Sequence, residues 1–495
     1  MTGERGPSSA PGGDRLGGAH ALDDSQRRAL RRVLARWRES HVRSGAAERT
    51  GVETTPSRSR AVGAGTDIRL VDVEVLRAGR PGLIDVVAEM DGRLAHAVLG
   101  LRRPGDELRV VGAVEEPALG PLEDADGIAI AVDALHDADS ARLLLGAVAG
   151  TRLPSPAARA ALDASGLRGD SATVTVVHEA DDAMTLAFDR RYTLSVFSWL
   201  HRGPHPGVTL LAGLDDAGFN HLPAPVAFWR RAGRDLGIVQ ELLAGATNGW
   251  ALALTSLRDL FASGSSPDTA GGDFAPEAFA LGTMAARMHI ALDRAFGRRA
   301  GDVAVWVDAL EASTPSVCST SGDLVIDPLA HRLDMPLGDL LGSLRASGLH
   351  PPVIRTHGDF HLGRTARTDH GWVLADCMPG GTAPSAPGVP QAEPLAPLLR
   401  SPLADVADFT WSLRRAAAVA AAERVPASVP SRVDDLASAW EARNRRAFVA
   451  AYLATPGIGG LVPADRRVVR RLLSLFELAR AAVGGGSFRP VGRGP

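Results

Sequence analysis

Runs in which apolar and polar residues alternate fill the chain between Thr66 and about Glu116. Three of these runs are IRLVDVEVLRAG, LIDVVAEMDG and AHAVLGLRR, and Gly, Pro and Asp separate them. A period of two puts successive side chains on opposite faces of a strand, so the runs predict an antiparallel sheet. ALHDADSARLLLGAVAG then predicts a helix, and LPSPAARAALDASG a second helix or a connector. Residues 66–168 are therefore expected to form a small α+β unit.

A second group of strand patterns lies between Thr173 and Leu200, where TVTVVHEADDAMTLAFDRRYTLSVFSWL predicts a hairpin or a three-stranded meander. GVTLLAGLDDAG then predicts a helix, and VAFWRRAGRDLGIVQELL predicts two more strands. Beyond Asn248 helical patterns dominate, and a proline-rich segment at 384–397 interrupts them. The chain is thus expected to be rich in strands first and mostly helical afterwards.

Residues 1–65 lack the strand pattern. Residues 1–22 are rich in Gly, Pro and Ser, which predicts disorder, and residues 44–65 are similar and predict a linker. Residues 23–43 carry apolar side chains at helical spacing, namely Leu30, Val33, Leu34 and Trp37. A basic amphipathic helix can lie on a membrane or a partner, but so few apolar positions favour a helix with a solvated face.

The composition is close to the globular average, with 45% hydrophobic and 22% charged residues in 495. A formal net charge of -3 gives no electrostatic reason to expect nucleic acid or an anionic membrane as a partner. No segment is apolar for long enough to span a bilayer, and no apolar stretch follows the N-terminal charges. Two cysteines, Cys318 and Cys377, exclude a disulfide scaffold and suit a reducing compartment. We expect a cytoplasmic protein.

The chain contains no lysine, so all 54 of its Lys and Arg residues are arginines. A codon bias toward Ala, Gly and Arg is a sufficient cause. Whatever the cause, any mechanism that needs a lysine side chain is excluded.

The segment HGDFHLGR at residues 357–364 is followed by the apolar run WVLAD, which ends at Asp376. A tight glycine turn that presents one aspartate, followed by a strand ending in another, is the central arrangement of kinase-like folds. Asp359 would orient the acceptor hydroxyl and take its proton, and Asp376 would hold magnesium. A lone HGD can be only a turn, but its pairing with the second aspartate favours the kinase-like hypothesis.

The neighbours of these aspartates are expected to have structural roles. His357, Gly358 and His361 would brace the loop by hydrogen bonds rather than bind metal. Cys377, beside Asp376, is expected to be a small buried side chain.

HGDFHLGR followed by GWVLAD resembles the catalytic loop and metal strand of maltokinases, ATP-dependent enzymes of the aminoglycoside-phosphotransferase-like class that make maltose 1-phosphate. VQELLAGATNGWALAL at 239–254 resembles the hinge between the two lobes of that family. SPLADVA, WEARNRRAF and LLSLFELARAA resemble segments of its helical lobe. The likeness extends from about residue 66 to residue 485.

The resemblance implies an α+β, bilobal protein-kinase-like fold with a β-rich N-terminal cap and a mostly helical C-lobe. The domains would be an extension (1–65), the cap (66–168), the N-lobe (169–247) and the C-lobe (248–490). It implies ATP and Mg²⁺ as cofactors if the protein is active, and nucleotide binding at the hinge residues Gln240, Glu241 and Leu242.

Three positions depart from the family pattern. Ser195 stands where the resemblance places the lysine that binds the ATP phosphates, and Thr209 stands where it places the glutamate paired with that lysine. Arg364 occupies the position of the Asn or Gln that binds a second metal ion. A hydroxyl cannot neutralise phosphates, and a guanidinium has no acceptor atom for a metal.

These departures leave the enzymatic activity open and support three hypotheses. The first is a maltokinase-like protein of α-glucan or trehalose metabolism with impaired or lost phosphotransfer, a binding or regulatory role, and possibly a partner enzyme of that metabolism. The alternative is an active ATP-dependent sugar or aminosugar kinase that uses Asp359 and Asp376. A weaker alternative is an aminoglycoside-type phosphotransferase.

Overall fold

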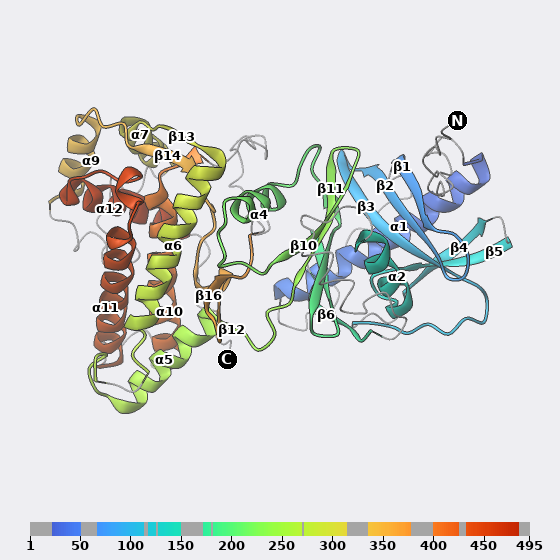
Figure 1. Ribbon diagram of the computed structural model, residues 1–495, viewed down its shortest axis with the longest axis horizontal. Coiled ribbons are helices and arrows are strands. Elements are labelled where there is room, and N and C mark those ends of the chain that lie inside the picture. The colour runs from blue at the N-terminus through green and yellow to red at the C-terminus, as the bar shows by residue number, and fades with distance from the viewer. Residues whose placement is uncertain are drawn as a thin grey trace, which may run out of the picture. The chain divides into compact units, whose positions relative to one another are not determined.

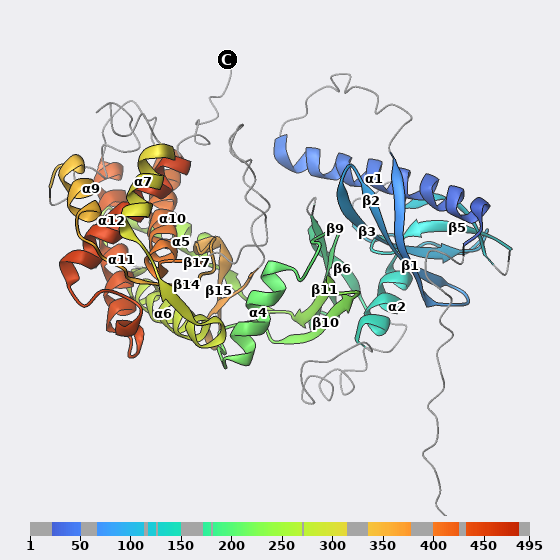
Figure 2. The same ribbon diagram turned by 90° about the horizontal axis from the view of Figure 1, so that it is seen from above.

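The computed structural model describes residues 22–50, 67–112, 117–124, 127–149, 172–179, 182–269, 272–313, 335–377, 399–424 and 432–484. The expected second helix or connector at 153–166, Cys318 and the proline-rich segment 384–397 lie outside these ranges. The chain divides into two compact units. Unit 1 comprises Met1–His205 and Pro225–Leu242, and unit 2 comprises Pro206–Ala224 and Leu243–Pro495. The described parts of each are mixed α/β, with several antiparallel sheets (Figures 1 and 2).

Unit 1 contains two antiparallel sheets. The first has the order β1-β2-β3-β5-β4, with β9 added beside β3. Its strands are β1 (Ile68–Arg77), β2 (Gly82–Met90), β3 (Arg93–Arg102), β4 (Ala118–Asp124), β5 (Gly127–Asp133) and β9 (Trp199–Leu200). The second has the order β10-β11-β8-β7-β6. Its strands are β6 (Val174–Glu179), β7 (Ala183–Phe188), β8 (Tyr192–Phe197), β10 (Pro225–Arg231) and β11 (Arg234–Glu241). Helix α2 (Ala138–Ala149) contacts strands of both sheets.

Helix α1 (Asp24–Thr50) lies across the first sheet and closes its core (Figure 2). Its apolar stripe, Leu30, Val33, Leu34 and Trp37, is buried in one cluster with side chains of the sheet. The other face of the helix is polar, as expected. The helix continues to Thr50, into the stretch predicted to be a linker, because the Ala and Glu of GAAE favour helix as much as coil.

Unit 2 is mostly helical. Its helices are α4 (Pro206–Asp216), α5 (Gly249–Ser263), α6 (Ala275–Phe296), α7 (Val303–Ser313), α9 (Leu337–Arg345), α10 (Pro402–Ala422), α11 (Arg432–Ala454) and α12 (Arg466–Gly484), with the short turns η2 (Leu362–Arg364) and η3 (Ile458–Gly460). Two small sheets have the orders β12-β15-β16 and β13-β14-β17. Their strands are β12 (Thr247–Asn248), β13 (Arg298–Ala300), β14 (Pro352–Arg355), β15 (Thr365–Thr368), β16 (Gly371–Leu374) and β17 (Leu399–Arg400).

Three stacked phenylalanines form the centre of unit 2. Phe409 of α10 lies between Phe360 of the 357–364 loop and Phe448 of α11, with ring centroids 5.1 and 4.2 Å away. All three rings are fully buried, so the loop is anchored to the helical core by its own side chain. Helices α6 and α11 approach closely at Gly282, where a Cβ would lie 2.2 Å from the carbonyl oxygen of Phe448.

Candidate active site

The candidate site is the 357–364 loop, which follows β14 and includes η2, together with Asp376, two residues after the end of β16. Gly358 makes the turn with a φ of 84°, a conformation that L side chains rarely adopt. The backbone amide of Ala375 donates to the carbonyl of Arg364 at 2.8 Å, which holds the end of the second strand against the loop. The two aspartates singled out from the sequence are therefore brought together.

Asp405, in the first turn of α10, fixes the backbone of the loop. Its fully buried carboxylate accepts hydrogen bonds from the amides of His357 (2.8 Å) and Gly358 (3.0 Å). It also pairs with Nε2 of His289 at 3.1 Å, and Nδ1 of His289 is 2.9 Å from the hydroxyl of Tyr452. Burial alone would raise the pKa of Asp405, but its hydrogen bond with His289 and the electrostatic interactions with its neighbours outweigh burial and lower that pKa.

His357 connects the two aspartate-bearing segments. A backbone amide can only donate, so Nδ1 of His357 accepts from the Asp359 N–H at 3.2 Å. Its Nε2 therefore carries the proton and donates to the carbonyl oxygen of Asp376 at 3.0 Å. Burial lowers the pKa of this histidine, which keeps the ring neutral at pH 7. The bracing role predicted for His357 and Gly358 agrees with these contacts.

Arg364 lies between the two aspartates. Its Nη2 donates to Oδ2 of Asp359 at 2.9 Å, its Nε is 3.3 Å from the same oxygen, and its Nη1 donates to Oδ2 of Asp376. The Arg364 side chain is only 17% exposed. Nε2 of His361 lies 3.6 Å from Oδ2 of Asp359.

These neighbours set the charge of Asp359. Burial alone would raise its pKa, but the hydrogen bonds and charges of His361 and Arg364 hold the pKa of Asp359 well below the ordinary carboxyl range. Burial also opposes the charged guanidinium, yet Asp376 and Asp359 raise the pKa of Arg364 above its usual value. Asp359 and Arg364 are therefore both ionised at neutral pH.

Cys377 is buried, as expected, and burial raises the pKa of its thiol.

The remaining predicted residues lie on other elements. Gln240 and Glu241 end β11 in unit 1, and the amide of Leu242 donates to the carbonyl of Arg191 at 2.8 Å. Ser195 lies in the middle of β8, with its hydroxyl 2.8 Å from that of Thr185 on β7. Thr209 lies on α4, which groups with unit 2. The structure thus gathers Asp359, Asp376 and their loop neighbours within unit 2, and the hinge residues and Ser195 within unit 1.

The residues best suited to hold metal do not fit a two-ion arrangement. Asp376 offers carboxylate oxygens, which suit Mg²⁺. Arg364 offers only N–H donors, and its positive charge lies against the same carboxylate. Within the described ranges, no group of three or more His, Cys, Asp or Glu side chains is arranged to hold a metal ion.

Sequence reasoning missed Asp405, His289 and Tyr452. A signal was present, because Asp405 interrupts the apolar run PLADVADF at the start of a helix, and a carboxylate at such a position must find buried partners. His289 in LGTMAARMHIAL is a similar polar residue on a buried helix face.

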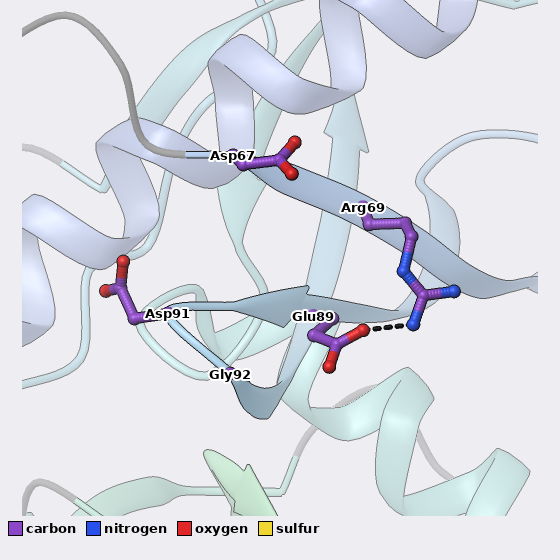
Figure 3. Close-up of a pocket in the computed structure, with 5 residues that line it drawn as sticks. All are labelled: Asp67, Arg69, Glu89, Asp91 and Gly92. Carbon is purple, nitrogen blue, oxygen red and sulfur yellow. Dashed lines mark hydrogen bonds and ion pairs between the residues drawn. The ribbon is translucent and has the colours of Figure 1, made fainter.

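A hollow on the surface of unit 1 is lined by Asp67, Arg69, Glu89, Asp91 and Gly92 and has a volume of about 210 Å³ (Figure 3). Three of its charged side chains are already paired, since Arg69 pairs with Glu89 and Asp91 pairs with Arg38. The lining of the hollow is mostly polar, unlike that of most small-molecule sites, and we assign it no ligand.

Comparisons with known proteins point to one kind of enzyme. A glucosamine kinase from Mycolicibacterium smegmatis is 30% identical over 313 residues, which cover 58% of this chain and 70% of that protein. A glucosamine kinase from Streptacidiphilus jiangxiensis is 32% identical over 279 residues, covering 53% and 58% respectively. No family model matches the chain.

Solved structures agree on the fold. A glucosamine kinase structure matches with a TM-score of 0.56 and 21% identity, covering 87% of this chain and 92% of that one. A glucosamine kinase in complex with glucosamine, ADP and inorganic phosphate matches with a TM-score of 0.55 and 20% identity, covering 88% and 96%.

The maltokinase assignment from the sequence was wrong, because these relatives are glucosamine kinases. In kinase-like folds such a loop and strand serve phosphotransfer rather than acceptor recognition, so this pattern carries no information about the acceptor. No helix among the described residues is long and apolar enough to cross a membrane. The identity over more than two thirds of the first relative places this chain in the glucosamine kinase family.

Proposed function

We propose that this chain is an ATP-dependent kinase whose acceptor is glucosamine or a closely related aminosugar. The observation that carries the proposal is the pair Asp359 and Asp376, held together by the Asp405 and His357 contacts in a member of the glucosamine kinase family. This favours the active alternative over a protein without activity. A maltose acceptor and a place in glycogen synthesis have no support from the relatives.

The chemistry assigned to Asp359 follows from its charge. Its ionised carboxylate would orient the acceptor hydroxyl and take its proton as the oxygen attacks the γ-phosphorus of ATP. The bond from that phosphorus to the bridging oxygen breaks, and ADP leaves with the electron pair. ATP reaches kinases as its magnesium complex, and Asp376 is the residue that we propose contacts that ion.

The finer architecture belongs to the same proposal. We assign residues 66–168 to a cap, 169–247 to a kinase-like N-lobe and 248–490 to the C-lobe, with 1–65 as an extension that includes α1. The backbone of Gln240, Glu241 and Leu242 would bind adenine. The positive charge that Ser195 cannot supply to the phosphates would come from arginine, since the chain has no lysine.

An acceptor series tests the proposal. We expect ATP-dependent phosphorylation of glucosamine with a kcat/KM on the order of tenfold or more above that of glucose, N-acetylglucosamine and maltose, because a site for an ammonium group rejects analogues without it. ADP release and the mass of the product are the measurements. A preference for maltose, or ADP release equal with and without every sugar, would contradict it.

A further inference from the structure

The positive charge that lies between Asp359 and Asp376 belongs to a side chain of the protein, that of Arg364. Arg364 contacts both carboxylates at once, two of its nitrogens on Oδ2 of Asp359 and a third on Oδ2 of Asp376. These carboxylates are partly buried, with side chains 29% and 38% exposed. Two negative charges this close repel each other unless a positive charge lies between them, and here the guanidinium supplies it.

The backbone holds Arg364 in this place. Its amide donates to the carbonyl of His361 at 2.9 Å, and its carbonyl accepts from Ala375 at 2.8 Å. One bond fixes it to the loop that carries Asp359, and the other to the residue before Asp376. The side chain therefore starts from a point tied to both aspartate-bearing segments.

A guanidinium in this position competes directly with a divalent ion. Both are attracted to the same carboxylate oxygens, but Arg364 is part of the chain and therefore stays close to these oxygens. A divalent ion that approached Oδ2 of either aspartate would meet a positive charge within hydrogen-bond distance of that oxygen.

We propose that Arg364 is a built-in cation that takes the place of one divalent ion, so that this active site binds one metal ion fewer than a two-metal kinase. The inference rests on the proposed function for its catalytic meaning. When phosphates are bound, the planar guanidinium can also donate to their oxygens, a task for which arginine geometry is suited.

Manganese binding to the nucleotide-free protein, followed by electron paramagnetic resonance, tests the inference without any activity. We expect the wild type to bind no Mn²⁺ at the aspartate pair, so that Asp376→Asn leaves its binding curve unchanged. Arg364→Gln should create a site with Mn²⁺ affinity on the order of tenfold or more above background, and the double variant Arg364→Gln/Asp376→Asn should lose it.

Matched controls separate this effect from a general loss of charge. Arg367→Gln removes a nearby arginine that pairs with Glu277 at 3.3 Å, and it should leave Mn²⁺ binding as in the wild type. Arg364→Asn serves as a second variant if Arg364→Gln has a lowered melting temperature. The inference is overturned if Asp376→Asn weakens Mn²⁺ binding by the wild type, or if neither folded Arg364 variant gains a site.

A second arm counts the Mn²⁺ ions bound with ADP. The wild type should hold one ion and Arg364→Gln two, whereas equal numbers would overturn the inference. Absence of ADP binding by both proteins would count against the proposed function, while the nucleotide-free experiment would still decide the role of Arg364.

Discussion

A single buried carboxylate, Asp405, organises the candidate site. It accepts two loop amides and pairs with His289, so it acts on Asp359 only through the backbone of the loop. We therefore regard it as a positioning residue. Its importance follows from its complete burial, since an amide or charge left unpaired at this depth is costly.

Asp405→Asn should lower the free energy of unfolding by about 3 kcal/mol, because it removes a buried charge that three donors share. It should also lower kcat more than it raises KM for the acceptor. Denaturant unfolding and kinetics are the measurements. Asp339→Asn, an exposed aspartate in the first turn of α9, is the control and should stay within about 0.5 kcal/mol of the wild type. Equal effects of the two substitutions would contradict the assignment.

His136 should make the free energy of unfolding depend on pH, and the direction of that dependence follows from its neighbours. Its Nδ1 is 3.5 Å from Asp133, its Nε2 is 3.7 Å from Glu179, and the ring of His41 is 6.4 Å away. Burial opposes its charge, but Asp133 and Glu179 outweigh burial and raise the pKa of His136. The stabilisation is complete below the unfolded pKa of about 6.5 and is lost as pH rises through the folded value.

The free energy of unfolding of the wild type should therefore fall as pH rises from 6.5, by an amount on the order of 1 kcal/mol. His136→Gln should lack this contribution. The exposed His370 provides the control, because His370→Gln should keep the wild-type slope. Parallel slopes for wild type and His136→Gln would show that His136 is not the source.

Among the secondary-structure elements, the close contact between α6 and α11 depends on one glycine. Gly282 of α6 faces the backbone of α11, and an added Cβ would lie 2.2 Å from the Phe448 carbonyl oxygen. Phe448 in turn stacks on Phe409, so a displaced α11 would disturb the stack that anchors the loop.

Gly282→Ala should lower the free energy of unfolding by about 1 to 3 kcal/mol, because backbone cannot move as easily as a side chain end. Gly342→Ala, in α9, meets nothing within 4 Å and should be neutral or stabilising by up to about 1 kcal/mol. Unfolding curves measured side by side test the pair. A harmless Gly282→Ala would mean that α6 and α11 can separate at little cost.

The local pattern of apolar and polar residues was enough to predict many of the helices and strands. Alternation predicted the strands on both sides of Thr173, and the spacing of Leu30 and Trp37 predicted α1. The pattern did not predict what α1 covers, because spacing shows that a stripe is apolar and not which surface it meets. Its end was also misplaced, since helix ends depend on capping and packing more than on composition.

The same limit applies to the site. Asp359 and Asp376 could be found from HGD and WVLAD, because their chemistry fixes both residue types and order. The pairing of Arg364 with both could not, since it depends on how two strands fold together.

For the molecule as a whole, the sequence motifs could not identify the acceptor substrate. Relatives whose matches cover 58% and 53% of the chain are glucosamine kinases. Ser195, Thr209 and Arg364 depart from the pattern that the sequence resembles, so Asp359 and Asp376 are the groups left to test. The central claim is that the chain transfers phosphate with Asp359 as its base.

The most direct measurement is the rate of ADP formation from ATP and glucosamine by the wild type and by Asp359→Asn, with equal melting temperatures as the folding control. We expect glucosamine-dependent turnover by the wild type and a kcat lower by about 10² to 10⁴ in the variant. Glucosamine-dependent turnover that survives Asp359→Asn unchanged, or a wild type with none, would contradict it.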